Sequence, residues 1–329
     1  MKLATIPGTG PDGRLVVVSR DLRSMVSASD IAPTLQNALE NWSEVEPALR
    51  QLFEALQEGA ASDVQPFDPA AALAPLPRAW QWLDGSVYES HGALMAQVFG
   101  IEDPPREKPL MYQGVSHRFY APAEDVPFRS EADGIDFEGE FAVLTDAVPM
   151  GVSAAQAVGH IRLIGQLNDW SLRTIAPVEM KTGFGWIHAK PPCSMAPVVV
   201  TPDELGEAWR DGQVALRLQV DWNGARFGEP HGAAMGFSFP ELVAHAAETR
   251  DLCAGTIIGS GTVSNANYRE VGSTCIAERR GIELIDHGKP GTPFMRFGDR
   301  VRMEAVTAAG ETVFGPIDQR VVRRALPEQ

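Results

Sequence analysis

The stretch Asp136-Phe137-Glu138-Gly139-Glu140-Phe141 places three carboxylates at alternate positions. Because side chains alternate across a β-strand, we expect the carboxylates on one face and the two phenylalanines on the other. Burying three unpaired carboxylates is costly, whereas a divalent cation that prefers oxygen ligands turns that cost into a gain. A solvated acidic edge strand is the alternative. The apolar run 142–144 that follows favours a strand that enters the core, and with it the metal site.

The composition is that of an ordinary globular protein. The chain has 329 residues, of which 44% are hydrophobic and 22% charged, enough for one large domain with or without a small one. Its 31 glycines and 25 prolines favour many turns and a β-rich fold. The net charge of −15 argues against nucleic acid or an anionic membrane as the main partner, although local Lys and Arg clusters can still bind anionic substrates.

Cysteine usage and the amino-terminal residues indicate the compartment. Cys193, Cys253 and Cys275 lie far apart and form no CxxC pair, so a disulfide framework or zinc knuckle is not expected, and we place all three in the core. The first residues lack the apolar core of a signal peptide, and no apolar run approaches the length of a membrane span. We therefore expect a soluble, cytoplasmic protein.

Turn and capping signals predict a small amino-terminal domain, residues 1–75, and a larger domain, residues 76–329. The first contains a hairpin of strands 3–6 and 15–18, a helix capped by Asp30, and a helix opened by Ser43 and Glu46 that stops at Gly59. An Ala-, Pro- and Asp-rich linker follows at 60–78.

The larger part reads as strands with a few helices, a β-rich α+β fold of the sandwich or barrel type. Its expected elements are an extended segment 80–84, a helix 86–99, a mostly irregular stretch 102–132 with a short apolar run 110–112, a strand 160–167, a hairpin 216–221/225–227, a helix from Ser238 to about Arg250, a strand 256–258, and a final hairpin 299–306/312–315.

Three motifs resemble the fumarylacetoacetate hydrolase family. Residues 136–143, DFEGEFAV, resemble its D-[YF]-E-x-E-x-A-V core; residues 168–173, NDWSLR, resemble N-D-W-S-x-R; and residues 261–264, GTVS, resemble G-T-[IV]-S. They occur in the family's order and at similar separations. The resemblance covers residues 78–305, and residues 1–75 fit the family's variable amino-terminal domain more loosely.

The resemblance implies a β-sandwich roll, a homodimer, and a Mg²⁺ or Ca²⁺ ion, with Mn²⁺ as an alternative. By motif position, the four metal-binding carboxylates are Asp84, Glu138, Glu140 and Asp169. His91, seven residues after the first of these, matches the family's catalytic histidine. Lys190 lies near the family's catalytic lysine. The expected substrate-binding residues are Tyr112, Arg173 and Thr262.

These residue types suit cleavage of a C–C bond in a 1,3-dicarbonyl or 2-oxo acid. The metal acts as a Lewis acid on the substrate oxygens, and His91 removes a proton from water. The leaving carbon departs as an enolate, which Lys190 helps to stabilise. The fork of Arg173 suits a substrate carboxylate.

Each residue also has an ordinary structural interpretation. Taken alone, His91 would be a helix-surface histidine, Lys190 a loop lysine, Asp169 a turn cap, Arg173 the partner of a surface carboxylate, and Tyr112 half-buried packing.

The sequence departs from the family pattern around the histidine and the substrate. The glutamate that orients the histidine in eukaryotic-type members is replaced by Ile276, and Glu278, expected two residues on along the same strand face, or Glu89 is the candidate instead. A substrate-contacting glutamine is replaced by Ala176, and a tyrosine by Ser86.

Three functions therefore stay open. The first is hydrolysis of a fumarylacetoacetate-like or acylpyruvate-like C–C bond in aromatic-compound catabolism. The second is decarboxylation, dehydration or keto–enol isomerisation of a 2-oxo acid by a lyase or isomerase at the same metal site, which needs enolate stabilisation but no activated water. The third is a non-catalytic, metal-stabilised relative.

Overall fold

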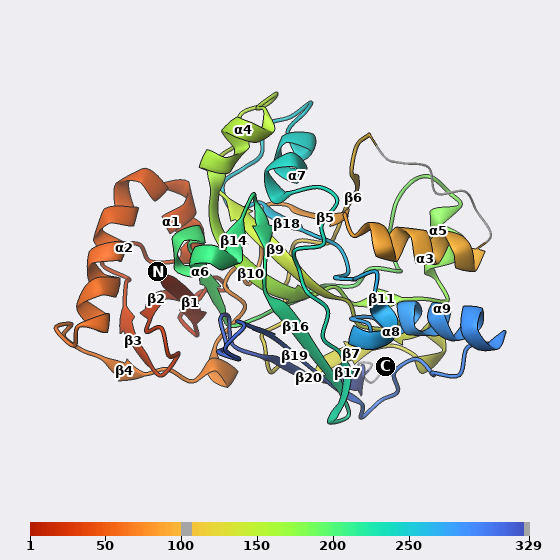
Figure 1. Cartoon of the computed structure of the whole chain (residues 1–329). Helices are drawn as coiled ribbons and strands as arrows, with labels where there is room; N and C mark the ends of the chain where they lie inside the picture. Colours follow the sequence, from red (N-terminus) through yellow and green to blue (C-terminus); the bar gives the residue numbers. More distant parts are fainter. Residues whose placement is uncertain (100–106, 326–329) are drawn as a thin grey trace.

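A computed structural model describes residues 1–99 and 107–325, and its largest feature is an eleven-stranded sheet (Figure 1). The strand order is β4-β3-β2-β1-β13-β10-β9-β18-β5-β6, with β12 also paired to β10. The bounds are β1 Lys2–Ile6, β2 Arg14–Val18, β3 Ser24–Ser27, β4 Gln65–Pro66, β5 Trp82–Ser86, β6 Leu110–Gln113, β9 Gly139–Thr145, β10 Ile161–Asn168, β12 Ser194–Met195, β13 Val198–Val200 and β18 Ile257–Gly259. Most pairs are antiparallel, while β5 and β18 are parallel.

A second, five-stranded sheet packs against the first, so the chain is a β-rich α+β protein, as the sequence predicts. Its order is β17-β16-β19-β20-β7, with bounds β7 Val126–Phe128, β16 Arg217–Trp222, β17 Ala225–Gly228, β19 Arg300–Val306 and β20 Ile317–Arg323. Phe141 and Val143 of the large sheet share one apolar core with Leu218 and Met303 of the small one. Two short pairs complete the strands: β8 Ile135–Asp136 with β11 Ser171–Leu172, and β14 Trp209–Arg210 with β15 Gln213–Val214.

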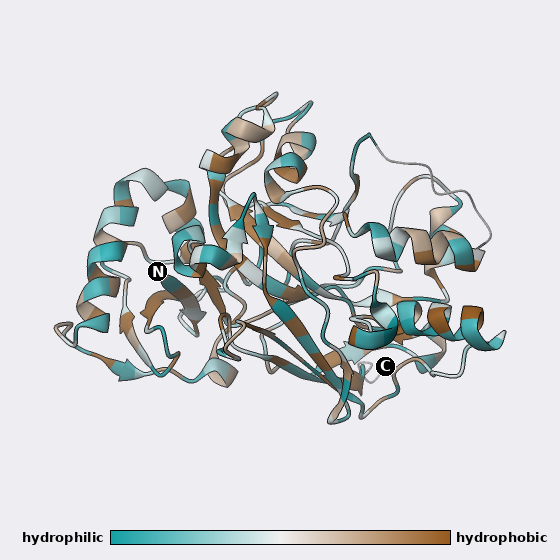
Figure 2. Ribbon diagram, viewed as in Figure 1, coloured by the Kyte–Doolittle hydropathy of each residue, from teal (hydrophilic) through white to brown (hydrophobic). Residues whose placement is uncertain are grey.

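The helices cover the outside of the sheets. Their bounds are α1 Leu35–Glu40, α2 Trp42–Gln57, α3 Glu89–Phe99, α4 Ala154–Ala157, α5 Ala176–Met180, α6 Pro202–Leu205, α7 Phe239–Ala246, α8 Tyr268–Val271 and α9 Ile276–His287. Helices α1 and α2 accompany the amino-terminal strands, and α3 lies against α9 on the other side of the molecule (Figure 1). Figure 2 shows that α2 is largely hydrophilic on its outer turns, whereas the central strands are hydrophobic.

The amino-terminal strands extend the main sheet. The expected hairpin is present as β1 and β2, and β1 also pairs with β13, with Leu3 opposite Val199. Two helix starts differ from the sequence prediction. The cap of α1 is Thr34 instead of Asp30, and α2 begins at Trp42, so Ser43 lies inside the helix. Local capping patterns misplaced these starts because α1 ends directly at α2, at Asn41.

The acidic stretch does not form the single strand that alternation predicts. Strand β8 ends at Asp136 and pairs with β11, whereas β9 begins at Gly139 and pairs with β10. Between the two strands, the backbone N–H of Glu138 donates to Oδ1 of Asn168, and the carbonyl of Glu138 accepts the N–H of Asp169. The three carboxylates consequently point into three different environments.

Three further expectations need correction. The final hairpin turns where expected, since Val306 bridges Thr312 and the N–H of Val313 donates to the carbonyl of Ala305, but the strand that pairs along β19 is β20, Ile317–Arg323. Residues 312–315 leave β19 because the carbonyl of Phe314 accepts the N–H of Val198. Glu278 lies in the first turn of α9 and not on a strand. Cys253 is exposed, whereas Cys193 and Cys275 are buried, and none of the three forms a disulfide. Of the expected irregular stretch, residues 102–106 lie outside the described residues.

Within residues 1–99 and 107–325, we find no helix with the length and apolar character that a membrane crossing requires.

Candidate active site

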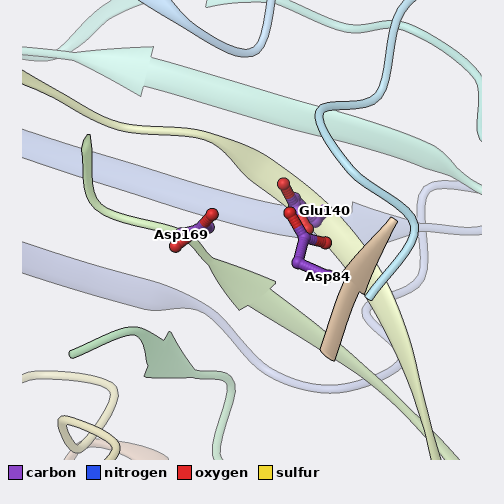
Figure 3. Close-up of side chains that lie close together, drawn as sticks. All are labelled: Asp84, Glu140 and Asp169. Carbon is purple, nitrogen blue, oxygen red and sulfur yellow. The ribbon is translucent and has the colours of Figure 1, made fainter. Parts of the chain in front are cut away.

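Three carboxylates carried by separate strands of the large sheet converge (Figure 3). Asp84 lies on β5, Glu140 on β9, and Asp169 directly after β10, and one oxygen of each lies within 4.8 Å of the others. Pairing explains the convergence, since β9 lies next to β10 and is separated from β5 only by β18. All three side chains are buried. This is the arrangement that a hard divalent cation binds through oxygen ligands.

The electrostatics of the triad fit a cation. Burial raises the pKa of Asp84 and of Glu140 well above the usual range, and the neighbouring carboxylates raise them further. Burial also raises the pKa of Asp169, although Lys190 partly offsets the effect. In the described part of the chain no donor reaches either carboxylate oxygen of Glu140, while Asp84 accepts the N–H of Gly261 at 3.1 Å. A buried carboxylate that no donor reaches has both oxygens available as ligands for a cation.

Glu138, the fourth predicted metal residue, lies against cations instead of in the triad. Its carboxylate forms ion pairs with the guanidinium of Arg173 and with Nζ of Lys190, the latter at 2.5 Å. Burial opposes ionisation of Glu138, but the two cations outweigh it and hold the pKa below the usual range. Glu138 therefore borders the triad through its partners.

Lys190 joins Glu138 to the triad. Its Nζ also lies 2.6 Å from Oδ2 of Asp169, and its side chain is only 10% exposed. Burial alone would lower the pKa of Lys190, but Asp169 and Glu138 raise it, so the ammonium stays charged. The loop lysine suggested by its local sequence is thus a buried cation beside the carboxylate cluster.

Arg173 is committed to two carboxylates of the protein. Its Nε donates to Oδ2 of Asp136 at 2.8 Å, and its terminal nitrogen pairs with Glu138. A substrate carboxylate would therefore have to share this guanidinium with, or displace, one of them. Among the predicted substrate residues, Tyr112 touches the cluster directly, because its hydroxyl donates to Oδ2 of Asp169 at 2.7 Å. Thr262 is buried directly after Gly261, which bonds Asp84.

His91 and Glu278 form a hydrogen-bonded pair. Nδ1 of His91, on α3, lies 2.8 Å from Oε2 of Glu278, on α9, and the glutamate side chain is fully buried. The pair forms because α3 packs against α9, two helices far apart in sequence. The sequence predicted Glu278 on a strand, two residues after Ile276. It lies on a helix instead, and the helix places it against His91. The alternative partner Glu89 lies against Gly236.

One residue at the site, Cys193, was not predicted, and another, Asp136, was expected in a different environment. The thiol of Cys193 donates to Oδ1 of Asp169 at 3.0 Å, and burial followed by the charge of Asp169 raises its pKa, so it stays a donor. Asp136 was expected among the metal-facing carboxylates, but it accepts hydrogen bonds from the first turn of α9. The alternation pattern indicates that Asp136 is buried. No residue near Cys193 in the sequence indicates that its thiol contacts Asp169.

Comparison with family models identifies both parts of the chain. Residues 81–322 match the model described as "Fumarylacetoacetate (FAA) hydrolase C-terminal", and residues 1–78 match "Fumarylacetoacetase N-terminal domain 2". No curated protein matches the sequence.

Solved structures share the fold over nearly the whole chain. A protein described as a "probable" 2-hydroxyhepta-2,4-diene-1,7-dioate isomerase from Mycobacterium abscessus superposes with a TM-score of 0.68 at 17% identity, covering 99% of this chain and 100% of that one. Maleylpyruvate hydrolase from Sphingobium sp. SYK-6, in complex with manganese(II) and pyruvate, gives 0.66 at 16% identity, with 99% and 100% covered. A 5-carboxymethyl-2-hydroxymuconate delta-isomerase from Mycobacterium smegmatis gives 0.59 at 18%, with the same coverage. At these identities the likeness concerns the fold.

Proposed function

Because this chain belongs to the fumarylacetoacetate hydrolase family, we propose that it is a metal-dependent hydrolase that cleaves a C–C bond of a 1,3-dicarbonyl substrate of the acylpyruvate or fumarylacetoacetate type. We place this reaction in the breakdown of aromatic compounds. The names of two structural neighbours, a 5-carboxymethyl-2-hydroxymuconate delta-isomerase and a maleylpyruvate hydrolase, indicate small dicarboxylic or 2-oxo acids as their substrates.

The observation that carries the proposal is the pair of His91 and Glu278. Hydrolysis needs an activated water, whereas decarboxylation and isomerisation do not. A glutamate that accepts the Nδ1 proton of a histidine leaves Nε2 free as a base and stabilises the imidazolium after it takes a proton. We assign this tautomer from the partner, since a carboxylate can only accept. His91 would thus take the proton from the attacking water.

The carboxylate cluster would hold the cation. Asp84, Glu140 and Asp169 are the ligands that the geometry supports, with Glu138 as the fourth residue of the set. A bound Mg²⁺, Ca²⁺ or Mn²⁺ supplies Lewis-acid polarisation of the substrate's carbonyl oxygens. The manganese and pyruvate of the Sphingobium hydrolase support this ligand chemistry.

Lys190 would contribute positive charge beside the leaving enolate. Its ammonium lies between Asp169 and Glu138, at the edge of the cluster. Tyr112 and Thr262 would line the substrate site from the same side as Asp169 and Asp84. Arg173 would bind a substrate carboxylate while it keeps its ion pairs with Asp136 and Glu138, so the three carboxylates would share one guanidinium.

The test is a spectrophotometric assay of the chelator-treated protein with fumarylacetoacetate and a series of acylpyruvates, with and without Mg²⁺ or Mn²⁺. We expect metal-dependent loss of the diketone absorbance and formation of two carboxylic products. His91→Gln should lower kcat by about 100-fold or more, as expected for loss of a general base. His160→Gln is the matched control, because its Nδ1 also lies 2.8 Å from a carboxylate, that of Asp146, away from the cluster.

A lyase or isomerase is the second candidate, because two structural neighbours are named isomerases. It predicts turnover of a 2-oxo acid or a dienedioate with little loss in His91→Gln, since enolate stabilisation does not require activated water. Turnover of no diketone by a protein that binds metal tightly would reject hydrolysis in favour of this candidate. A protein that binds metal and turns over neither class would be the non-catalytic relative.

Assembly and location form the last part of the proposal. We infer a homodimer from the family resemblance and a cytoplasmic location, a reducing compartment with which three cysteines outside disulfides are consistent. Light scattering coupled to size exclusion measures the assembly, and a monomeric mass would reject the dimer.

A further inference from the structure

Asp136 is a completely buried carboxylate that the proposed reaction does not use. Its two oxygens accept three hydrogen bonds: Oδ1 from the N–H of Ile276 at 2.7 Å, and Oδ2 from the N–H of Ala277 at 2.9 Å and from Nε of Arg173 at 2.8 Å. Three donors on two oxygens hold this carboxylate in one position.

On one side, Asp136 fixes the first turn of α9. The first backbone N–H groups of a helix have no partner within it. Here Asp136 takes those of Ile276 and Ala277, and Sγ of Cys275 accepts that of Glu278 at 3.3 Å. Glu278 therefore belongs to the turn that Asp136 holds, and its side chain is the one that bonds His91.

On the other side, Asp136 is connected to the carboxylate cluster. Arg173 bridges Asp136 to Glu138, and Lys190 bridges Glu138 to Asp169. An unbroken series of ion pairs thus runs from the start of α9 to the triad, and Asp136 is its only carboxylate, among the described residues, that also bonds the helix.

We propose that Asp136 is a positioning residue, which sets the place of the His91–Glu278 pair relative to the carboxylate cluster by joining the first turn of α9 to Arg173. The inference rests on the proposed function, because it assigns to the pair and the cluster one common substrate. Without Asp136, backbone contacts from Glu138 and Gly139 to Cys275 and Thr274 would still hold the residues before α9 beside β9, but the first turn of α9 would lose its side-chain link to Arg173.

Asp136→Asn tests this, because the amide keeps the size and one acceptor but turns a donor toward either the helix N–H or Arg173. We expect kcat to fall by about 10–100-fold, the usual effect of losing a group that orients a functional side chain, with little change in Mn²⁺ affinity. Asp146→Asn is the matched control, since Asp146 also accepts from an arginine, Arg162, and lies away from the cluster. It should leave kcat unchanged.

A double-mutant cycle with Glu278→Gln separates positioning from general damage. If Asp136 acts through Glu278, adding Asp136→Asn to Glu278→Gln should cost much less than its full factor. An equal factor in both backgrounds, or an unaltered kcat in Asp136→Asn, overturns the inference. Should Asp136→Asn fail to fold, Asp136→Ser keeps an acceptor for a helix N–H and removes the charge that pairs with Arg173, and the same cycle applies.

A readout without turnover keeps this inference separate from the proposed function. The Nδ1 proton of His91, bonded to a carboxylate, should give a downfield proton resonance that disappears in His91→Gln and in Glu278→Gln. We expect it to weaken or vanish in Asp136→Asn and to persist in Asp146→Asn. If the wild type cleaves no diketone, the proposed function fails, and this resonance alone decides the inference: an unaltered signal in Asp136→Asn rejects it.

Discussion

At the scale of single residues, Glu140 shows how a site that is costly for folding can be useful for binding. Both of its oxygens lie buried without donors in the described chain, beside two further carboxylates. In a chelator-treated protein that arrangement is repulsive, whereas a bound cation would use the same charges as ligands.

We therefore expect Glu140→Gln to have opposite effects on stability and on binding. Without metal, and at a pH above the raised pKa of Glu140, the variant should be more stable by about 1–3 kcal/mol, since it removes a carboxylate whose ionisation burial and the neighbouring carboxylates oppose. Its Mn²⁺ affinity should fall at least about 10-fold. Urea unfolding and calorimetric titration measure the two quantities. Glu304→Gln, which changes a half-buried glutamate of β19 paired with Arg302, is the control, and a loss of metal-free stability in Glu140→Gln would contradict the prediction.

The same carboxylates predict a pH dependence. Burial, and after it mutual repulsion, raises the pKa of Asp84 and Glu140 in the folded state. In the unfolded chain the pKa of such carboxyl groups is about 4. The stability that these groups contribute is thus fully present below the unfolded pKa and is lost as pH rises through the raised folded pKa. Without metal, Glu140→Gln should gain in Tm over the wild type as pH rises from about 5 to about 8. Thermal unfolding at several pH values measures this, and a pH-independent difference would be evidence against it.

Cation binding should show the complementary trend. Because the metal competes with protons for these carboxylates, its stabilising effect should grow with pH in the wild type. The rise in Tm on adding Mn²⁺, measured over the same pH series, tests this part of the argument.

At the scale of elements, the turn after β18 fixes Asp84. Gly261 has φ of +78° and donates its N–H to Asp84, and a Cβ at this position would lie 2.5 Å from the carbonyl oxygen of Gly85. Neither the left-handed backbone nor the close approach tolerates a side chain. The glycine of the GTVS motif is therefore needed for structure, because it lets the loop pass close beside β5.

Gly261→Ala should consequently be much more harmful than Gly310→Ala. Gly310 also has a positive φ, +83°, but no atom lies within 4 Å of a Cβ there, so the cost is the backbone term of about 1–2 kcal/mol. At Gly261 the steric clash adds about 1–3 kcal/mol. Denaturant unfolding compares the two variants, and Mn²⁺ affinity should fall only in Gly261→Ala. Equal losses of stability would show that the Gly85 contact does not matter.

At the scale of the whole molecule, the amino-terminal residues are part of the main sheet. Strand β1 pairs with β13, and Leu3, Leu15 and Trp42 share a buried core with Leu163 and Val199. The two family models meet near residue 78, but the main sheet and one apolar core continue across this boundary.

We expect residues 79–329, produced alone, to aggregate or to lack a cooperative transition, because removal of residues 1–78 exposes the edge of β13 and the shared core. Size exclusion and circular dichroism measure this. Production of residues 1–78 and 79–329 as two chains in one cell is the control and should yield a soluble complex. A monodisperse, folded 79–329 fragment would show that the two parts are independent.

The sequence by itself determined the family, the β-rich class and which carboxylates are candidates for the site, because motifs and hydrophobic periodicity are local properties of the chain. It predicted Asp84, Glu140 and Asp169 as residues of one site, and the structure brings them together. It misplaced the start of α1 and α2 and the last strand, where local caps and turns compete with tertiary pairing.

Only the tertiary structure decided which partner each charged side chain has. The same alternation that joined Asp136, Glu138 and Glu140 on one predicted face could not show that the chain leaves the strand between β8 and β9. It thereby sends Asp136 to α9, Glu138 to Lys190 and Arg173, and Glu140 to the triad. Glu278 meets His91 because two helices distant in sequence pack together. Charge and spacing fix which residues are available, but a contact between distant residues depends on how strands and helices pack, which no local pattern encodes.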